Sequence, residues 1–580
     1  MKINEIFQND KFTVNDYLKY CGVKDVNKYL KPEWSIDNHN NYKYMKDAVA
    51  MFNNHYGNMS PAYIICDSDL DGITSTSILY SYMIDLGIET NDDWDIQILL
   101  HKGKERGLQD EEIFNYILNN PRPFVIIPDA GTNDKIWVNE INKNNIDGIN
   151  IDFLVLDHHD IETPITGDNT VLVNNQDILN NNISKNGSGC LVTYMFLKAL
   201  DECYCREEAD NYIDLVALSL ISDSMDMSDQ QNRVFYHYGL ETIDNIRNIF
   251  LYKTFEKFIG DKPYTQRDIS FKIVPKFNSV VRSDDIELNK RIIECFVGCE
   301  NDYDDILEKC AECHKNQIKL VDNIINNHND AINKASKNNI VVLSCNDMPR
   351  SYSGLVAGKV MNICNKPTII GKIKDNTLIG SLRSPIPLRN ELNENEYVEW
   401  AIGHENSCGI SIAENNIDKL IDYYNALELS YEPHIDVLKS YTIENVPDNV
   451  FDLFGANLDV IWGHNIPKPL FEIHNIIFHP SDIQILGANK RTVKIINNGV
   501  SFLIFNVTKK QKEDLGLGVI IDGEFYERLD PSSDKKYVLS AIGSLSVNRY
   551  KSYVNNQMII DSFNVSEYKP KTAQSVFGKR

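Results

Sequence analysis

The sequence lacks the long apolar segments of a membrane protein and the leader of a secreted one. No stretch reaches the length of about 18 apolar residues that a transmembrane helix needs, so no membrane partner is expected. Met1–Glu5 lacks the pattern of a positive charge followed by an apolar run that opens a signal peptide. We therefore expect a cytoplasmic protein.

Cysteine spacing likewise gives little support for a metal or haem site. Cys203 and Cys205 have no second cysteine pair at the spacing of a zinc ribbon. Cys310, Cys313 and His314 match a haem-attachment motif, but apolar residues recur around them at spacings of three and four, which is typical of one face of a long helix. We interpret these cysteines as reduced side chains that pack in the interior.

Positive charge is scarce. The 58 Lys and Arg residues against 83 Asp and Glu residues give a net charge of −25. This balance argues against general affinity for polyanions, although a local basic groove remains compatible because phosphate contacts are made residue by residue. It predicts weak, strongly salt-dependent binding to nucleic acid unless a partner assists.

Three apolar runs that each stop at an acid stand out. Phe153–Leu156 shows no alternation of apolar and polar residues, which is typical of a strand buried on both faces. Ala62–Cys66 and Phe124–Pro128 have the same character. The carboxyl ends of parallel strands meet at one edge of a sheet, where ligands bind. That edge would gather Asp67, Asp69, Asp71, Asp129, Asp157, His158 and His159.

Carboxylates at this density share a site only if cations neutralise them, because unpaired buried charge is costly. Mixed carboxylate and imidazole ligands favour Mn²⁺ or Mg²⁺. An EF-hand calcium loop also begins as Asp67–Gly72 does, but its twelfth position must be Glu, and here it is Ile78. We expect instead a helix that starts just after Gly72, whose amino end favours anions.

Other segments leave alternatives open. Asp214–Asp223 is a near-continuous apolar helix bracketed by acids, so Asp223 needs a partner, which is a metal, a helix cap or an arginine. The loop His101–Gly107 carries three cations that either hold phosphates or form a solvated charged segment. Gly380–Ser384 and Ala401–Gly409 are either loops that reach a phosphate or turns between strands.

The apolar patterns predict an α/β protein in five parts. We expect an N-terminal helical segment (1–60), a catalytic domain with a parallel sheet (61–251), a helical connector (252–336), a smaller α/β domain (337–430) and a C-terminal β-barrel or sandwich with a basic tail (431–580). Pro275–Arg282 would be an extended piece within the connector. Cations and aromatic residues interleave in the last part, as in a surface that stacks bases or in a purely structural barrel.

Taken together and in order, these motifs resemble the DHH phosphoesterase superfamily, and within it the RecJ-type single-strand-specific exonucleases. The correspondence comprises the first motif Asp67–Gly72, the second at Asp129, the naming motif Asp157-His158-His159, the fourth at Asp214–Asp223, the DHH-associated loops Gly380–Ser384 and Gly403-His404, and the OB-fold entry Trp462–Phe471. The resemblance implies a DHH domain with a parallel sheet, a DHH-associated domain and an OB-fold-like domain.

The resemblance also implies two bound Mn²⁺ or Mg²⁺ ions and a role for each site residue. The implied metal ligands are Asp67, Asp69, Asp71, Asp129, His158 and Asp223. The implied catalytic residues are His159, as a ligand or a contact of the scissile phosphate, Asp157, as a group that orients a ligand, and His404. The implied phosphate-binding residues are Ser381, Arg383 and His404, with Lys102 and Arg282 as further candidates.

Several positions depart from the family pattern. Ile402 replaces a glycine before the histidine of the associated domain, and Lys102 stands where an arginine is usual. Ser279–Val281 does not fit the connector motif. In the same loop as Lys102, Arg106-Gly107-Leu108 breaks the rest of the family pattern. These departures concern end recognition and processivity, and they leave the metal-ligand set unchanged.

The implied function is metal-dependent hydrolysis of single-stranded DNA from the 5′ end, in DNA recombination, repair or replication, by a monomer that a helicase or a single-strand-binding protein assists. A second hypothesis is a small-substrate enzyme that cleaves oligonucleotides, cyclic dinucleotides or pyrophosphate. The C-terminal barrel argues against it, because a small substrate needs no long binding track. A third is a non-catalytic single-strand-binding scaffold, against which the full set of metal-type residues argues.

Overall fold

The fold is described from a computed structural model. It covers residues 2–90, 94–102, 106–144, 148–260, 264–427, 434–454, 456–487, 490–521, 524–527, 535–550 and 553–569. Part of the cationic loop, residues 103–105, and most of the predicted basic tail, residues 570–580, lie outside these ranges. The chain divides into two compact units, one of Asn27–Tyr431 and one of Met1–Val26 with Glu432–Arg580.

A parallel five-stranded sheet forms the centre of the DHH-like part, and it contains the three apolar runs. Its strands stand in the order β3 (Ile96–Leu100), β2 (Ala62–Cys66), β4 (Phe124–Pro128), β5 (Asp152–Asp157) and β6 (Thr170–Asn174). Every residue of β2 and β4 is buried, as expected for strands covered on both faces. The predicted parallel sheet is confirmed.

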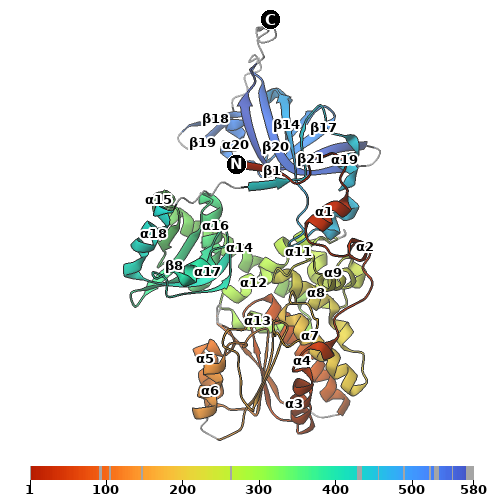
Figure 1. The fold of residues 1–580 in the computed structure, drawn as a ribbon, viewed down its shortest axis with the longest axis vertical. Coiled ribbons are helices and arrows are strands. Elements are labelled where there is room, and N and C mark those ends of the chain that lie inside the picture. The colour runs from red at the N-terminus through yellow and green to blue at the C-terminus, as the bar shows by residue number, and fades with distance from the viewer. Residues whose placement is uncertain are drawn as a thin grey trace. The chain divides into compact units, whose positions relative to one another are not determined.

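Helices cover both faces of this sheet (Figure 1). One face packs on α5 (Glu111–Asn119) and α6 (Lys135–Asn144), whose Ile117 and Ile141 share a buried cluster with Val125 of β4. The other face is covered by α3 (Met45–Gly57), α4 (Leu70–Thr90) and α7 (Gly189–Tyr204). With both faces closed, only the ends of the strands remain available for a polar site.

Helix α4 begins earlier than predicted. It starts at Leu70 rather than after Gly72. The reason is local, because Asp69 Oδ1 accepts hydrogen bonds from the backbone N–H groups of Asp71 (3.0 Å) and Gly72 (3.2 Å) and thereby caps the first turn. The last two acids of the first motif therefore lie at and within the amino end of a helix.

Helices connect the two sheets of this unit. They are α8 (Ile213–Ser222), α9 (Gln230–Gly239), α10 (Ile249–Phe258), α11 (Gln266–Lys272), α12 (Val274–Arg282), α13 (Ile286–Val297), α14 (Tyr303–Asn327) and α15 (Asn329–Ala335). The prediction that Pro275–Arg282 is extended is wrong, since α12 covers it. Proline is tolerated there because the first turn of a helix needs no N–H donor. Helix α14 confirms the helical interpretation of Cys310 and His314.

The smaller α/β part contains a second, mixed sheet. Its strands stand in the order β10 (Trp400–His404), β11 (Ser407–Ala413), β9 (Thr377–Arg383), β8 (Thr368–Lys374) and β7 (Val341–Ser344), with the helices α16 (Ser353–Cys364), α17 (Arg389–Glu394) and α18 (Ile417–Ala426). Residues 380–383 lie within β9, and Ala401–Gly409 forms the β10–β11 hairpin. Both segments are therefore strand and turn rather than long loops.

The second unit joins the two ends of the chain. Strand β1 (Lys2–Glu5) pairs in parallel with β12 (His434–Val437), and α1 (Val14–Tyr20) belongs to the same unit. The predicted segment 1–60 is thus divided between the two units and is not one continuous helical piece. The reason is that β1 gains its backbone partners from residues far along the chain.

The core of this unit is a seven-stranded sheet. Its strands stand in the order β13 (Ser440–Thr442), β14 (Phe471–Phe478), β20 (Tyr537–Tyr550), β21 (Tyr553–Glu567), β17 (Val500–Ile504), β16 (Thr492–Asn497) and β15 (Gln484–Leu486). The remaining elements are α19 (Asp448–Leu453), α20 (Lys509–Asp514) and the hairpin β18 (Gly518–Ile521) and β19 (Glu524–Glu527). Strands β14 and β16 touch although they are not neighbours in the sheet, so the sheet curls as an OB-like barrel requires.

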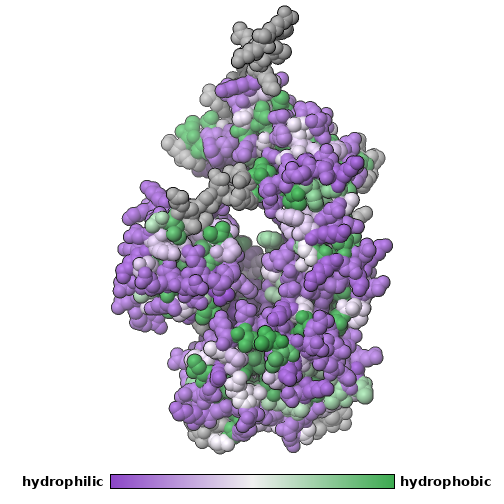
Figure 2. All heavy atoms as spheres, in the orientation of Figure 1, coloured by the Kyte–Doolittle hydropathy of each residue, from purple (hydrophilic) through white to green (hydrophobic). Residues whose placement is uncertain are grey.

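The surface is polar over most of the face seen in Figure 2, where hydrophobic side chains gather only in small patches. Among the helices that the structure describes, none is both long enough and apolar enough to cross a membrane.

Candidate active site

The strand ends bring the predicted acids and histidines together. Asp67 follows β2, Asp129 follows β4 and Asp157 ends β5, and these three strands are neighbours. The ligand atoms fall into three groups, and within each group they lie within 4.8 Å of one another. The groups are Asp67, Asp69 and Asp129; Asp71, His158 and Asp223; and Asp129, Asp157, His158 and His159. Asp129 and His158 each belong to two groups, so the cluster is continuous.

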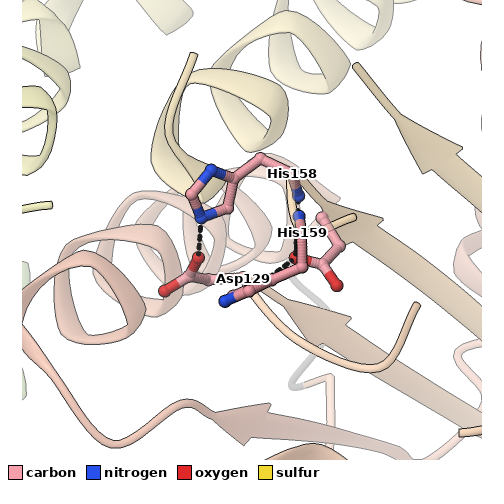
Figure 3. Close-up of side chains that lie close together, drawn as sticks. Asp129, His158 and His159 are labelled. Carbon is pink, nitrogen blue, oxygen red and sulfur yellow. Dashed lines mark hydrogen bonds and ion pairs between the residues drawn. The ribbon is translucent and has the colours of Figure 1, made fainter. Parts of the chain in front are cut away.

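His158 lies at the centre of this cluster. Its Nε2 is 3.2 Å from Asp129 Oδ1, a contact drawn in Figure 3. It is also 3.5 Å from Asp223 Oδ2 and 3.8 Å from Asp71 Oδ2. Asp223 ends the buried helix α8 and reaches the cluster from there. The sequence left a metal, a helix cap or an arginine as possible partners of Asp223. In the structure Asp223 lies beside the candidate metal-binding cluster.

Asp71 is held by the amino end of α7. It accepts hydrogen bonds from the backbone N–H groups of Gly189 and Cys190, each at 2.9 Å. A Cβ atom on Gly189 would lie 2.2 Å from Asp129 Oδ1, so only glycine allows α7 to come this close. The sequence analysis gave Gly189 no role, since a lone glycine in a turn is common.

Asp157 faces a different set of donors. Its carboxylate accepts hydrogen bonds from the Thr132 backbone N–H (3.0 Å), the His158 backbone N–H (2.7 Å) and His159 Nδ1 (2.8 Å). Burial alone would raise the pKa of Asp157, but the charge of His159 and its hydrogen bond lower that pKa well below the usual range. Asp157 is therefore an ionised group that fixes the orientation of His159, rather than one with oxygens left over for a metal.

Burial shifts the pKa values of several other cluster residues toward their uncharged forms. Burial, followed by repulsion from neighbouring acids, raises the pKa of Asp129 well above its usual value and that of Asp71 to about 7. Burial also lowers the pKa of His158 to about 3, which leaves its imidazole neutral and able to donate a lone pair. Asp129 holds its position in the left-handed region, at φ +66°, where a residue other than glycine is strained.

Divalent cations fit these residues. The buried Oδ1 atoms of Asp67 and Asp129 accept no hydrogen bond from the described residues, although buried polar atoms are usually satisfied. A carboxylate-rich set with one neutral imidazole suits Mn²⁺ or Mg²⁺. Asp67, Asp69, Asp71, Asp129, His158 and Asp223 are the residues that would hold such cations.

The remaining predicted residues come from α12 and from the second sheet. Arg383 ends β9 and lies against Gly354 at the start of α16, where a Cβ atom would be 2.6 Å from its Nη2. Ser381 Oγ lies 2.8 Å from Ser353 Oγ in the same place. Arg282, at the end of α12, is half-buried, and its Nε is a buried atom without a hydrogen-bond partner in the described part of the chain.

These cations are connected to the metal cluster through α12. Asn278, one turn before Arg282, accepts a hydrogen bond from the backbone N–H of Leu70 at the start of α4 (3.1 Å). Burial lowers the pKa of Arg282, and the nearby charge of Arg383 lowers it further, while Asp69 opposes both. Arg282 has an unpaired donor, and the charge of Arg383 lies nearby. Together the two guanidinium groups form a site that attracts anions.

His404 and Lys102 have different surroundings. Burial and the charge of His159 lower the pKa of His404, which ends β10. Lys102 is not brought to the cluster, because its Nζ pairs with Glu112 at 2.6 Å and its side chain is 54% exposed. The cation of this loop that does approach is Arg106, whose Nη1 lies 2.9 Å from His159 Nε2. The sequence analysis named Lys102 of this loop, whereas the structure brings Arg106 next to His159.

Comparisons with known proteins agree with this geometry. Residues 61–220 match the model of the DHH family, N-terminal domain. The chain is 24% identical over 96% of its length to the SPbeta prophage-derived protein YorK of Bacillus subtilis (strain 168), which is named a single-strand DNA-specific exonuclease, and it covers 96% of that protein. It is 23% identical over 91% of its length to the single-stranded-DNA-specific exonuclease RecJ of the same organism and covers 64% of it.

The fold has a solved counterpart. The crystal structure of RecJ in complex with Mn²⁺ from Thermus thermophilus matches 96% of this chain and 76% of that chain with a TM-score of 0.70 and 18% identity. The matched domain contains Asp67, Asp129 and the Asp157-His158-His159 motif. Residues 61–220 therefore match a DHH-family N-terminal domain, and the chain as a whole is similar to RecJ-type exonucleases in sequence and in fold.

Proposed function

We propose that the protein is a metal-dependent exonuclease that hydrolyses the phosphodiester bonds of single-stranded DNA from the 5′ end. The observation that carries the proposal is the continuous ligand cluster in which Asp129 and His158 each belong to two groups. Two ions that share a carboxylate can act on one phosphate from both sides. The relatives named single-strand-specific exonucleases align with nearly the whole chain, including the unit that contains the curled sheet.

In this proposal each part of the site has a separate task. The acids at the ends of β2 and β4, together with Asp71, His158 and Asp223, hold the ions. Bound Mn²⁺ or Mg²⁺ lowers the pKa of a coordinated water and stabilises the charge that develops on the phosphate. Asp157 fixes His159 beside them through the 2.8 Å hydrogen bond to Nδ1.

Arg282 and Arg383 are proposed to hold the substrate phosphates. Arg282 and Arg383 offer guanidinium donors without a carboxylate partner within 4.0 Å among the described residues. Ser381 and His404 add a hydroxyl and an imidazole from the second sheet.

One assay tests the proposal. The protein is incubated with Mn²⁺ and labelled single-stranded DNA, a dinucleotide or pyrophosphate, beside an Asp129→Asn variant. We expect release of mononucleotides from the single strand by the wild type and no release by the variant. Cleavage of only the dinucleotide or pyrophosphate would contradict the exonuclease assignment, and no cleavage by the wild type would favour a scaffold that binds single strands.

We further propose that the enzyme acts in the cytoplasm as a monomer assisted by a helicase or a single-strand-binding protein. The net charge of −25 supports the need for assistance, because only local cations oppose the repulsion of the DNA. A salt titration tests this, and we expect the affinity for bare single-stranded DNA to fall by more than tenfold between low and physiological salt. A flat salt response would exclude it.

A further inference from the structure

Arg106 places a guanidinium group beside the metal-binding cluster. Its Nη1 lies 2.9 Å from Nε2 of His159, whose other ring nitrogen is bound to Asp157. Arg106 is exposed as a residue, while its guanidinium lies within reach of the charges of Asp67, Asp69 and Asp129. Its position therefore differs from that of a structural arginine buried under the site.

The donors of Arg106 are mostly unused. In the part of the chain that the structure describes, no ion pair within 4.0 Å joins it to an acid, whereas Lys102 of the same loop is bound to Glu112. A guanidinium carries five N–H donors in one plane, and the described contact with His159 involves Nη1 alone. The free edge of such a group matches two oxygens of a phosphate.

A rigid turn fixes the direction of Arg106. The next residue, Gly107, has φ +49°, and a Cβ atom there would lie 2.3 Å from Asp134 Oδ2. Asp134 accepts hydrogen bonds from the Leu108 backbone N–H (2.7 Å) and from Gln109 Nε2 (3.0 Å). Because Asp134 is buried in the segment that follows β4, the turn is attached to the same strand end that carries Asp129.

Arg106 also acts on the second phosphate-binding element. Its charge contributes, after burial and the charge of His159, to lowering the pKa of His404. The guanidinium is thus close to a metal-site residue and to a residue proposed to hold phosphates. The acids Asp67, Asp69 and Asp129 also act on the guanidinium. Once bound cations neutralise those acids, the unused donors favour an anion.

We propose that Arg106 binds the substrate, through hydrogen bonds from its guanidinium to a non-bridging oxygen of the phosphate that lies at the metal pair. This inference rests on the proposed function and adds a residue to it. It differs from a role in metal binding, because a guanidinium has no lone pair to donate to a cation.

The test compares Arg106→Gln and Arg106→Lys with a control, Lys143→Gln, which removes one exposed cation from the end of α6. Affinity is measured by fluorescence anisotropy with Ca²⁺ in place of Mn²⁺, on two single strands checked to be uncut. One strand is unmodified, and the other has a neutral methylphosphonate at its 5′-terminal linkage. Mn²⁺ affinity without DNA is measured by calorimetry.

We expect Arg106→Gln to weaken binding of the unmodified strand by about 10- to 100-fold, as for the loss of one charged hydrogen-bond partner. The same variant should bind the methylphosphonate strand as the wild type does, with Arg106→Lys intermediate and Lys143→Gln unchanged on both strands. Mn²⁺ affinity should stay within twofold of the wild type.

Equal weakening of both strands by Arg106→Gln, no weakening of either, or a loss of Mn²⁺ affinity would overturn the inference. If the wild type does not cleave single-stranded DNA with Mn²⁺, the proposed function fails and the inference fails with it. If the wild type cleaves and the Arg106 variants match it, the inference alone fails.

Discussion

Gly189 and Asp129 approach so closely that a Cβ atom on the glycine would lie 2.2 Å from the carboxylate oxygen. This contact lets the amino end of α7 donate two backbone hydrogen bonds to Asp71 while Asp129 keeps its place between both halves of the cluster. The glycine therefore determines the spacing of two metal-binding acids without contacting a metal itself.

We expect Gly189→Ala to reduce activity by about 100-fold, because a displacement near 1 Å in such a site has effects of that order. Mn²⁺ affinity, measured by calorimetry, should fall in parallel. Gly57→Ala is the control, since nothing lies within 4 Å of a Cβ atom there. Normal Mn²⁺ affinity in Gly189→Ala would show that the cluster tolerates the shift.

Asp157→Asn tests the orientation of His159. The amide can still accept one hydrogen bond, but it loses the charge that holds the ring, so we expect a 10- to 100-fold loss of activity. The ¹⁵N chemical shifts of His159 should report a changed proton distribution over the ring. Asp168→Asn, at an exposed acid, should change neither quantity. Unchanged ring shifts in Asp157→Asn would argue against an orienting role.

Metal removal should destabilise the protein, because the acids then repel one another without a cation between them. At Mn²⁺ concentrations of 100 times Kd, binding stabilises the folded state by about 2.7 kcal/mol. We expect a matching rise in Tm on adding Mn²⁺ to chelator-treated protein. Asp129→Asn should abolish this rise and should melt at a higher temperature than the metal-free wild type. A rise of equal size in the variant would place the ions elsewhere.

A pH dependence of stability is expected away from the active site, at Glu241. Burial would raise the pKa of Glu241, but its hydrogen bond with His237 and the charge of Arg233 lower it below 4.5. A carboxyl group with a lowered pKa contributes stability above the pKa of the unfolded chain and loses it as the pH falls. The free energy of unfolding should therefore decrease below about pH 4.5.

Glu241→Gln should remove that contribution. Arg233 is buried, with a side chain 2% exposed, and it would lose the carboxylate 2.8 Å from its Nη1. We expect a loss of about 3 kcal/mol at neutral pH that shrinks in acid, measured by urea unfolding. Glu308→Gln, at an exposed position of α14, is the control. A loss independent of pH would mean that packing, rather than charge, is affected.

The central sheet and the grouping of its acids were predictable from the sequence, because a buried parallel strand has an uninterrupted run of apolar residues. Phe153–Leu156 and its two counterparts needed no knowledge of the rest of the chain, and the rule that parallel strands end at one edge was enough to group their acids. The same local logic failed for Pro275–Arg282, because proline permits a first helical turn as readily as an extended piece.

What could not be predicted depends on contacts between distant segments. Nothing local distinguishes Gly189 from an ordinary turn glycine, since its role arises from the approach of α7 to the end of β4. Lys102 and Arg106 belong to one cationic loop, and only the tertiary bonds of the turn after Arg106 decide which of them faces His159. The charge pattern of the sequence therefore indicates which loop approaches the site, but tertiary packing determines which of its residues does so.

The pairing of β1 with β12 has a consequence for biosynthesis. A ribosome completes residues 2–5 at the outset but must add more than 400 residues before their partners, His434–Val437, exist. The first strand must therefore wait with its backbone groups unpaired while Asn27–Tyr431 is made and can fold. Nascent chains stalled before residue 434 should accordingly be open to proteolysis at their first residues, and a chaperone that shields this waiting edge would raise the yield of intact protein.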